Sequence, residues 1–465
     1  MDAKKIFTAH SNFFQSHARL LSVSERKKSL RKIDRWIVSH EGAIINSLWQ
    51  DFRKPAPETL LSEIKMVRDE LSLIRQSLAT WARPETTPNP LTLIGSRSQI
   101  YRQPKGPALI IGAWNYPFTL TIGPLLGAIA AGCTAVVKPS ELAPATSQLV
   151  ADLVADCFDP DYITVVQGGI PETQALLEQP WGHIFFTGSK RVGRIVMEAA
   201  AQHLSSVTLE LGGENPVIID KSANLSAAAA QLVWGKFFNA GQTCIAPNHL
   251  FIDRAVYDSF LEELQKALTD LYSRENEQPA TDIACLIGAS HFERMQQLLS
   301  DAEAQGAQVV VQGKQEPDAH YFGPTIVKDV PLNSPLVQEE VFGPILSCIP
   351  YDDIQPVYQH IDSQDAALAL YVFARNRRFV DQVIAHTTAG TTVVNTVNIQ
   401  FANPHLPFGG VGKSGVGKGH GWYSYAAFTH PRAVVRQGPL ALNRFIFPPY
   451  TPARERVVRW LYRWF

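Results

Sequence analysis

From about residue 107 onward, short β-branched runs alternate with helical windows, and this rhythm constrains the fold more than any other feature of the sequence. The runs recur at intervals of roughly 20–28 residues, which is typical of βαβ units in a parallel sheet. The series predicts an α/β protein with strands at 108–111, 134–137, 162–166, 183–186 and 207–211.

The alternation resumes in the C-terminal half, where strands are expected at 309–311, 369–374 and 391–394. Because 465 residues are enough for about two or three domains, two α/β domains explain the pattern better than one. The segment from about 8 to 82 carries apolar residues at helical spacing, with one helix opening at Ser24-Glu25. Residues 91–103 alternate loosely and predict an extended hairpin.

The composition is that of an ordinary globular protein, with 45% hydrophobic and 18% charged residues. A net charge of −1 gives no basic excess for nucleic acid, and no metal site is predicted. The five cysteines are sparse and odd in number, which argues against a disulfide framework and favours a reducing, cytoplasmic setting. We see neither a signal peptide nor an apolar run of the about 18 residues that a membrane span needs.

The run Gly241-Gln-Thr-Cys244 marks the strongest candidate for a reactive side chain. It follows an expected helix at 232–238, and its glycine and small polar residues are expected to break that helix and present the thiol. Oriented N–H groups in such a turn favour the nucleophilic thiolate. A free cysteine is more often a structural core residue, and we assign that role to Cys133, Cys157, Cys285 and Cys348.

Two polar residues at expected strands complete a possible reaction centre. Glu210 lies between two leucines, and desolvation there would raise its pKa and make it a better base. An edge position or a salt bridge is the alternative for this carboxylate. Asn115 ends the first strand, where ligands meet an open α/β sheet, and its amide could donate to an oxyanion. A turn asparagine before Tyr-Pro is the alternative.

Further strand ends carry residues suited to a nucleotide. Lys138 and Glu141 close the second strand and could engage ribose or phosphate oxygens, although charged turns are often only solvated. Gly188 and Ser189 open a helix, where N–H groups could face a pyrophosphate. The spacing of the glycines matches neither the usual dinucleotide fingerprint nor a P-loop, so the pattern alone is ambiguous. The glycine-dense stretch 408–417 predicts a tight loop.

Together these segments resemble the aldehyde dehydrogenase superfamily, and most closely its class 3 branch, which acts on fatty or aromatic aldehydes. The motifs that carry the resemblance are Trp114-Asn-Tyr-Pro-Phe, Gly241-Gln-Thr-Cys-Ile-Ala-Pro, Glu339-Glu-Val-Phe-Gly-Pro and Leu406-Pro-Phe-Gly-Gly-Val-Gly-Lys-Ser-Gly. The resemblance runs in order over nearly the whole chain and implies two Rossmann-like α/β domains plus a small β element. The implied parts are an NAD(P)-binding domain (1–82 and 104–210), a catalytic domain (211–405) and a bridging, oligomerisation element (83–103 and 425–440).

The resemblance also implies residue roles. Cys244 would be the nucleophile and Glu210 the general base, and Asn115 would form the oxyanion hole with the Cys244 backbone N–H. The implied contacts to NAD or NADP are Trp114, Lys138, Glu141, Gly188, Ser189, Val192, Leu211, Glu340 and Phe342. The expected reaction is oxidation of an aldehyde to a carboxylate through a Cys244 thiohemiacetal and a thioester, by an enzyme that is a homodimer.

Two other functions remain open at this point. The thioester could pass to coenzyme A in an acylating enzyme, although Glu210 favours hydrolysis by water. A non-catalytic NAD-binding structural protein could keep the same scaffold, although the presence of Cys244, Glu210 and Asn115 together disfavours this.

The sequence departs from the family pattern at two places. Glu214 stands where relatives usually carry Lys, which changes the charge near the domain junction. Lys190-Arg191 is more basic than the usual turn and could accommodate a 2′-phosphate, so both NAD and NADP stay open.

The last segment, 451–465, is expected to be an amphipathic helix. Arginines 456, 459 and 463 fall largely opposite an apolar face made by Val457, Val458, Trp460, Leu461, Trp464 and Phe465. The helix is too short to cross a bilayer. Two interpretations remain open, namely peripheral attachment to anionic lipid and docking on the same subunit or its dimer partner.

Overall fold

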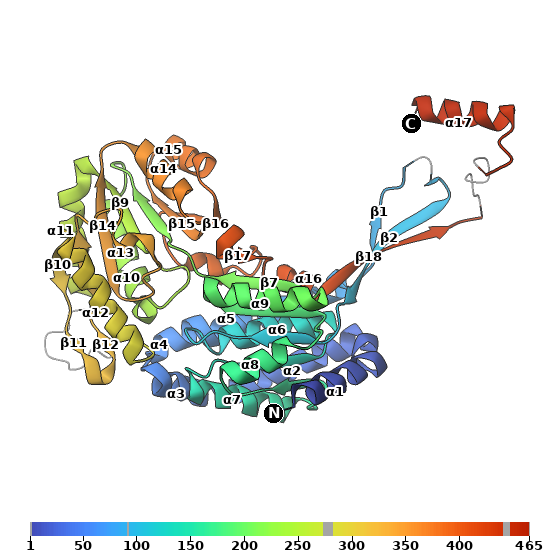
Figure 1. Cartoon of the computed structure of the whole chain (residues 1–465), viewed down its shortest axis with the longest axis horizontal. Coiled ribbons are helices and arrows are strands. Elements are labelled where there is room, and N and C mark those ends of the chain that lie inside the picture. The colour runs from blue at the N-terminus through green and yellow to red at the C-terminus, as the bar shows by residue number, and fades with distance from the viewer. Residues whose placement is uncertain (1, 91–92, 273–281, 440–446, 465) are drawn as a thin grey trace.

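The computed structural model describes residues 2–90, 93–272, 282–439 and 447–464. Two large sheets form two neighbouring bodies, and a narrow three-stranded ribbon extends from them (Figure 1). Apart from a short strand at Gly415–Val416 and the last residue of the strand Ser206–Leu211, the first sheet falls within the segments expected to form the NAD(P)-binding domain and the second within the expected catalytic domain. The bounds of both domains stay predictions.

The N-terminal helices cover the first large sheet. They are α1 (Ala3–Ser16), α2 (Val23–Ser39), α3 (Glu41–Phe52), α4 (Ala56–Thr59) and α5 (Lys65–Trp81). The prediction of helices in this region is confirmed, but α2 begins earlier than expected. Ser22 caps it, because the Ser22 hydroxyl accepts from the Glu25 N–H while the Glu25 carboxylate accepts from the Ser22 N–H.

The first large sheet has six strands. Its parallel strands are β3 (Ala108–Ile111), β4 (Ala135–Lys138), β5 (Ile163–Val165), β6 (His183–Gly188) and β7 (Ser206–Leu211), in the order β7-β6-β3-β4-β5. All five were predicted close to these bounds. The short β17 (Gly415–Val416) pairs antiparallel with β7. Because the chain goes from β3 to β4 and β5 and then returns to β6, the carboxyl ends of β3 and β6 border the point where ligands bind in such sheets.

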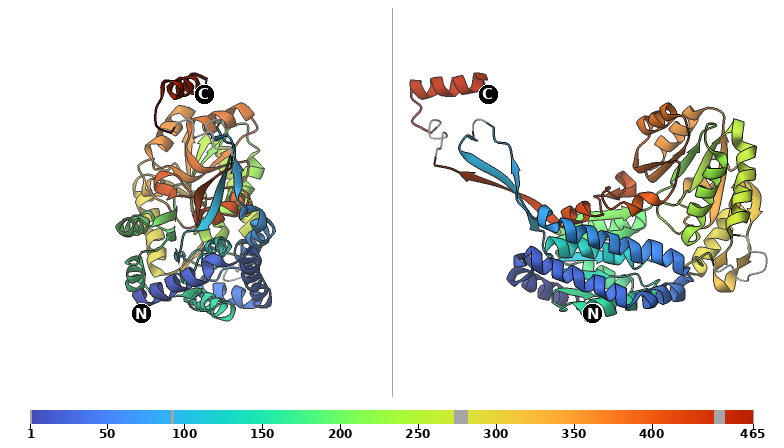
Figure 2. Two further views of the ribbon diagram at one scale, coloured as in Figure 1. Left: turned by 90° about the vertical axis from the view of Figure 1, so that its right-hand side faces the viewer. Right: turned by 180° about the vertical axis from the view of Figure 1, so that it is seen from behind.

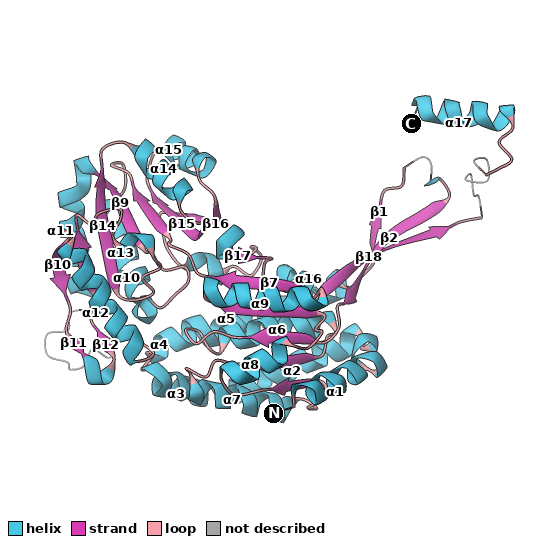
Figure 3. Cartoon of the chain, in the orientation of Figure 1, coloured by secondary structure: helices cyan, strands magenta, loops and turns pink. Residues whose placement is uncertain are grey.

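Helices lie on both sides of this sheet (Figure 3). They are α6 (Thr119–Ala131), α7 (Pro144–Cys157), α8 (Ile170–Leu177) and α9 (Lys190–His203). Helix α9 packs closely on β7, since a Cβ on Gly193 would meet the Leu211 side chain. The start of α9 therefore lies directly beyond the carboxyl end of β6.

The second large sheet has seven strands in the order β10-β13-β14-β9-β8-β15-β16. The strands are β8 (Pro216–Ile219), β9 (His249–Asp253), β10 (Gln308–Gln312), β13 (Thr325–Lys328), β14 (Ile345–Tyr351), β15 (Ala367–Phe373) and β16 (Ala389–Val394). The predicted strands β10, β15 and β16 are confirmed. However, β10 runs antiparallel to β13 and so does not continue the βαβ alternation.

The helices of this second body are α10 (Leu225–Phe237), α11 (Tyr257–Tyr272), α12 (Ala289–Ala304), α13 (Pro335–Gln338), α14 (Ile354–Ser363) and α15 (Arg377–His386). A separate two-stranded pair, β11 (Gln315–Glu316) and β12 (Tyr321–Phe322), lies beside α12.

The ribbon consists of β1 (Glu85–Thr87), β2 (Ser96–Pro104) and β18 (Thr429–Gln437), with β2 in the middle. The hairpin expected at 91–103 therefore begins earlier, at Glu85, while residues 91–92 lie outside the described part. Helix α16 (Trp422–Ala427) leads into β18. The two segments expected to form one bridging element thus meet in one antiparallel sheet, apart from residue 440, which is not described.

The expected C-terminal helix is confirmed as α17 (Pro452–Trp464), while Phe465 lies outside the described residues. The helix lies apart from the two large bodies, beyond the tip of the ribbon (Figure 2). Val457, Val458 and Trp460 are exposed on it. Within the described ranges, no helix combines the length and apolarity that crossing a membrane requires.

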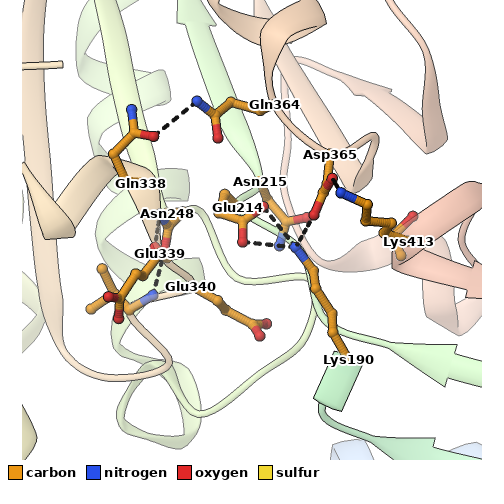
Figure 4. A network of polar contacts seen from close by, with 12 residues as sticks. Lys190, Glu214, Asn215, Asn248, Gln338, Glu339, Glu340, Gln364, Asp365 and Lys413 are labelled. Carbon is orange, nitrogen blue, oxygen red and sulfur yellow. Dashed lines mark hydrogen bonds and ion pairs between the residues drawn. The ribbon is translucent and has the colours of Figure 1, made fainter. Parts of the chain in front are cut away.

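An ion-pair network joins the two bodies, and it contains both sequence departures (Figure 4). Lys190, at the start of α9, donates to both carboxylate oxygens of Glu214 at 2.8 and 3.0 Å. It also reaches Asp365 at 3.3 Å, and Asp365 in turn lies 2.7 Å from the ammonium of Lys413. Glu214 follows β7 and Asp365 precedes β15, so the network connects the two sheets.

We expect removal of one partner of this network to lower the stability of the protein more than removal of both. Lys190→Met leaves the mostly buried Glu214 carboxylate near Asp365 without its cation, whereas Lys190→Met/Glu214→Gln removes the charge as well. The coupling between the two changes should be about 1 kcal/mol, measured from the apparent melting temperatures of the singles and the double.

The matched control is the exposed pair Arg254–Asp352, where Arg254→Met should change stability by about 0.5 kcal/mol or less. Strictly additive effects of Lys190→Met and Glu214→Gln would contradict a coupled network.

Candidate active site

The segment before Cys244 turns sharply after α10. The helix ends at Phe237, earlier than expected, because Asn239 and Ala240 already adopt left-handed backbone angles with φ of 55° and 53°. The expectation that Gly241 itself breaks the helix is therefore wrong. Gly241 has a different constraint, since a Cβ there would overlap the Gly343 carbonyl group. The turn is thus held between the helix and the 339–344 segment.

Asn115 lies beside this turn, at the carboxyl end of β3. Its side-chain amide donates to the Gln242 carbonyl oxygen at 3.0 Å. The next residue, Tyr116, places its hydroxyl 2.6 Å from the Thr243 hydroxyl. Asn239 closes the arrangement by donating to the carbonyl oxygens of both Asn115 and Gln242. The structure therefore brings Asn115 and the cysteine turn together, although 129 positions of sequence separate Asn115 from Cys244.

Glu210 is buried on β7 and has no ion pair within the described residues. The strand is not a free edge, because β17 covers its outer side and Gly415 pairs with Glu210. Neither carboxylate oxygen has a hydrogen-bond partner in the described part of the chain. Burial raises the pKa of Glu210 to about 8, against the opposing effects of Lys418 and of the nearby Gly419 N–H, which itself donates to the Phe408 carbonyl oxygen. This agrees with the expected direction for a desolvated carboxylate.

Burial has the largest effect on the Cys244 thiol. Burial raises its pKa well above the usual range, and the nearby carboxylates Glu340 and Glu210 raise it further. Backbone N–H groups of Cys244 and Ile245 lower the pKa, as expected, but by less than burial raises it. The turn N–H groups thus act in the expected direction, while burial opposes them. The thiol also senses the charges of Glu340 and Glu210.

The 339–344 segment approaches the same place from the second body. The Glu340 carboxylate lies against Gly212, where any Cβ would overlap it. Burial raises the pKa of Glu340 to about 8, and its Oε1 has no partner among the described atoms. The Phe342 ring meets Trp114 edge-on, with centroids 5.4 Å apart. Two predicted cofactor residues, Trp114 and Phe342, are thus in direct contact.

The other predicted cofactor residues lie at the carboxyl edge of the first sheet. Lys138 ends β4 and forms an ion pair with Glu141 at 3.3 Å. Ser189 follows Gly188 and caps α9, accepting from the Val192 N–H. Val192 and Leu211 share one hydrophobic cluster beneath this helix start. The N-terminus of α9 thus lies beside the carboxyl ends of β3 and β6, where the direction of the strand order reverses. This position fits the pyrophosphate of a dinucleotide.

Sequence reasoning missed two asparagines that hold the site (Figure 4). Asn215 donates to the Cys244 and Ala246 carbonyl oxygens at 2.8 and 3.0 Å. Asn248 accepts from the Val341 N–H at 2.8 Å and donates to the Glu339 carbonyl oxygen at 3.0 Å. Both side chains are buried. Their only sequence signal is a polar residue next to an apolar strand, which does not reveal a partner.

Comparisons with known proteins agree with this geometry. The model of the aldehyde dehydrogenase family matches residues 1–434. A 4,4'-diaponeurosporen-aldehyde dehydrogenase from Staphylococcus aureus is 37% identical over 440 residues, which cover 95% of this chain and 95% of that protein. A dimeric NADP-preferring aldehyde dehydrogenase from Canis lupus familiaris is 36% identical and covers 93% of this chain and 94% of its own length.

A solved structure, the substrate-bound state of Staphylococcus aureus AldH, has the same architecture. It matches with a TM-score of 0.94 at 36% identity and covers 98% of this chain and 99% of its own. The chain therefore belongs to the aldehyde dehydrogenase family.

Proposed function

We propose that this enzyme oxidises apolar aldehydes to carboxylates with NAD or NADP, using Cys244 as nucleophile and Glu210 as general base. The observation that carries the proposal is the meeting of three residues from separate elements. Asn115 contacts the turn that ends in Cys244, and Glu210 lies near enough to raise the pKa of the thiol. Such a set of nucleophile, base and amide donor suits acyl chemistry.

The residues divide the reaction between them. The Cys244 sulfur, once deprotonated, adds to the aldehyde carbon, and the Asn115 amide with the Cys244 N–H stabilises the oxyanion. Bound NAD or NADP supplies the acceptor for the hydride. Glu210 then takes a proton from the water that attacks the Cys244 thioester, and the carboxylate leaves. Because its pKa is about 8, Glu210 is a stronger base than an exposed glutamate. A buried base of this kind favours hydrolysis over transfer to coenzyme A.

The cofactor would lie across the carboxyl edge of the first sheet. The N-terminus of α9 at Ser189 would receive the pyrophosphate, and Glu141, whose side chain is half-exposed, would accept from ribose hydroxyls. Lys190 is bound to Glu214 and Asp365, so we assign it a structural role and no contact with a 2′-phosphate. Arg191 is exposed next to it and leaves NADP open.

The surroundings of Cys244 support an apolar substrate, either a medium- or long-chain aliphatic aldehyde or an aromatic one. The thiol packs against a hydrophobic cluster that includes Trp234 and Phe401 at its partly exposed margin. The Phe401 ring meets Phe408 edge-on with centroids 4.8 Å apart. One relative is named for 4,4'-diaponeurosporen-aldehyde, which fits an apolar pocket.

We further propose a homodimer formed through the ribbon. Among the described strands, β18 pairs only with β2, so its other edge offers backbone groups to a second chain. One relative is named as dimeric. Exposed edges of this kind are paired or covered in stable proteins.

We also propose that α17 attaches the enzyme, peripherally, to anionic lipid at a cytoplasmic membrane surface. Arginines 454, 456, 459 and 463 lie on a helix whose Val457, Val458 and Trp460 side chains are exposed. A basic, aromatic amphipathic helix of this length lies in the interface of a membrane and does not cross it. Attachment would place the active site near lipid-derived aldehydes.

Cys244→Ala should abolish aldehyde-dependent reduction of NAD and of NADP across a panel of aliphatic and aromatic aldehydes, because no other group replaces the sulfur. Cys157→Ala is the matched control, since Cys157 lies at the end of α7 and should leave turnover unchanged. Continued reduction by Cys244→Ala would overturn the mechanism.

Glu210→Gln should slow thioester hydrolysis by about 10²–10⁴-fold and leave the first turnover in place. In the unaltered enzyme, hydrolysis should accelerate as the pH rises through about 8 and then level off, because the active form of Glu210 is the deprotonated one. The measurement is burst and steady-state kinetics across pH. An unchanged steady-state rate in Glu210→Gln would remove Glu210 as the base.

The lipid proposal predicts that the full chain co-sediments with vesicles of phosphatidylcholine and phosphatidylserine, and that a variant lacking 451–465 does not. Binding should weaken with added salt, since arginine–phosphate attraction is screened. Arg456→Glu/Arg459→Glu, which keeps the apolar side chains, is the matched control and should also lose binding. Equal sedimentation of the full and shortened chains would show that the helix does not bind lipid.

A further inference from the structure

Hydrolysis of the thioester leaves a proton on Glu210, and this proton must depart before the next turnover. Glu210 is buried, and neither of its oxygens has a hydrogen-bond partner among the described residues. Burial separates most of this carboxylate from bulk solvent. A route of hydrogen-bonding groups must therefore connect Glu210 with the surface.

A small cavity adjoins Glu210 in the first body. Its volume is about 40 Å³, and its polar side chains come from Glu70, Thr119, Thr187, Glu210, His420 and Ser424. About 10–15 Å³ of such space is enough for one water, so this cavity has room for water beside the carboxylate. Thr187 Oγ1, His420 Nδ1 and both Glu210 oxygens are buried without a partner in the described protein. Several unsatisfied polar groups thus line one cavity.

These groups form a series from the buried Glu210 toward the surface. Thr187 is the register partner of Glu210 on the neighbouring parallel strand, so the two side chains lie on the same face of the sheet. His420 follows the glycine-dense loop, and its side chain is 11% exposed. Its Nε2 lies 4.0 Å from a carboxylate oxygen of Glu70, whose other oxygen accepts from the Gly421 N–H at 3.0 Å.

We propose that the proton on Glu210 leaves through this cavity, by way of water beside Thr187, to His420, which releases it to solvent next to Glu70. One imidazole nitrogen accepts a proton and the other gives one up, so the Glu210 carboxylate is restored and no electrons move. His420 acts through Glu210 and positions the exit route without touching the substrate. The inference rests on the proposed role of Glu210 as the base.

The charges around the route are compatible with this role. Helix α5 contributes Glu70, which opposes the lowering of the His420 pKa by burial. The lowered pKa keeps the imidazole neutral between transfers, so a proton from Glu210 stays on it only briefly before it leaves. Glu210 itself faces Lys418 and Cys244. Lys418 is the rival exit, but its ammonium already donates to the Gly409 and Gly410 carbonyl oxygens.

The test separates acylation from hydrolysis and uses the full chain without NAD. p-Nitrophenyl acetate acylates Cys244 and releases nitrophenolate in a burst, after which the steady rate reports hydrolysis of the thioester. His420→Gln should keep the burst rate and slow the steady rate about tenfold, a smaller loss than that expected for the base itself. The slowed rate should rise with buffer concentration, because an external base then carries the proton.

Thr187→Val removes the hydroxyl with little change in shape and should give the same buffer dependence if His420→Gln does not fold. His203→Gln, an exposed histidine on α9, is the matched control and should leave the steady rate independent of buffer. Buffer-independent hydrolysis in both His420→Gln and Thr187→Val would overturn the route. So would buffer dependence in Lys418→Met alone. If instead Glu210→Gln leaves hydrolysis unchanged, the proposed function fails first.

Discussion

The side chain of Asn239 joins the parts on which the active site depends. Its amide donates to the Asn115 carbonyl oxygen at 2.9 Å and to the Gln242 carbonyl oxygen at 3.1 Å. The first belongs to the end of β3 and the second to the turn before Cys244, so one buried amide fixes two bodies of the protein against each other. Its left-handed backbone is accessible to asparagine at lower cost than to most residues. Buried amides satisfied in this way give a single, rigid arrangement.

The sequence predicted the fold where local pattern decides it. Strands β3 to β7 are continuous apolar runs with turn signals, and each was placed nearly at its observed bounds. Strands β8, β9, β13 and β14 were not predicted, since their order in the sheet depends on pairing between distant segments. The ribbon was anticipated only in part because β2 pairs with β18, more than 300 positions later.

The same distinction between local pattern and long-range contact applies to the residues of the candidate site. Cys244, Glu210 and Asn115 stand out because each breaks a local rule, such as a carboxylate in an apolar strand. Asn215 and Asn248 break no local rule, and their importance lies in which backbone groups they reach across the fold. Likewise, the pairing of Glu214 with Lys190 connects two departures from the family pattern that the sequence presented separately. A change of charge at one position is accommodated by a charge that only the folded chain brings near it.

Burial has the same consequence for the three acidic groups of the site, because it raises the pKa of each. Cys244, Glu210 and Glu340 all hold their protons more tightly than in water, and the two carboxylates raise the pKa of the thiol further. Groups coupled in this way titrate as a set, so the site gains negative charge one step at a time. Negative charge on Glu210 or Glu340 raises the pKa of the thiol and so opposes formation of the thiolate. Because the thiolate forms only when the thiol proton can leave, Cys244 is protected from unwanted reactions between turnovers. The way in which protons leave the site is therefore part of how the enzyme works.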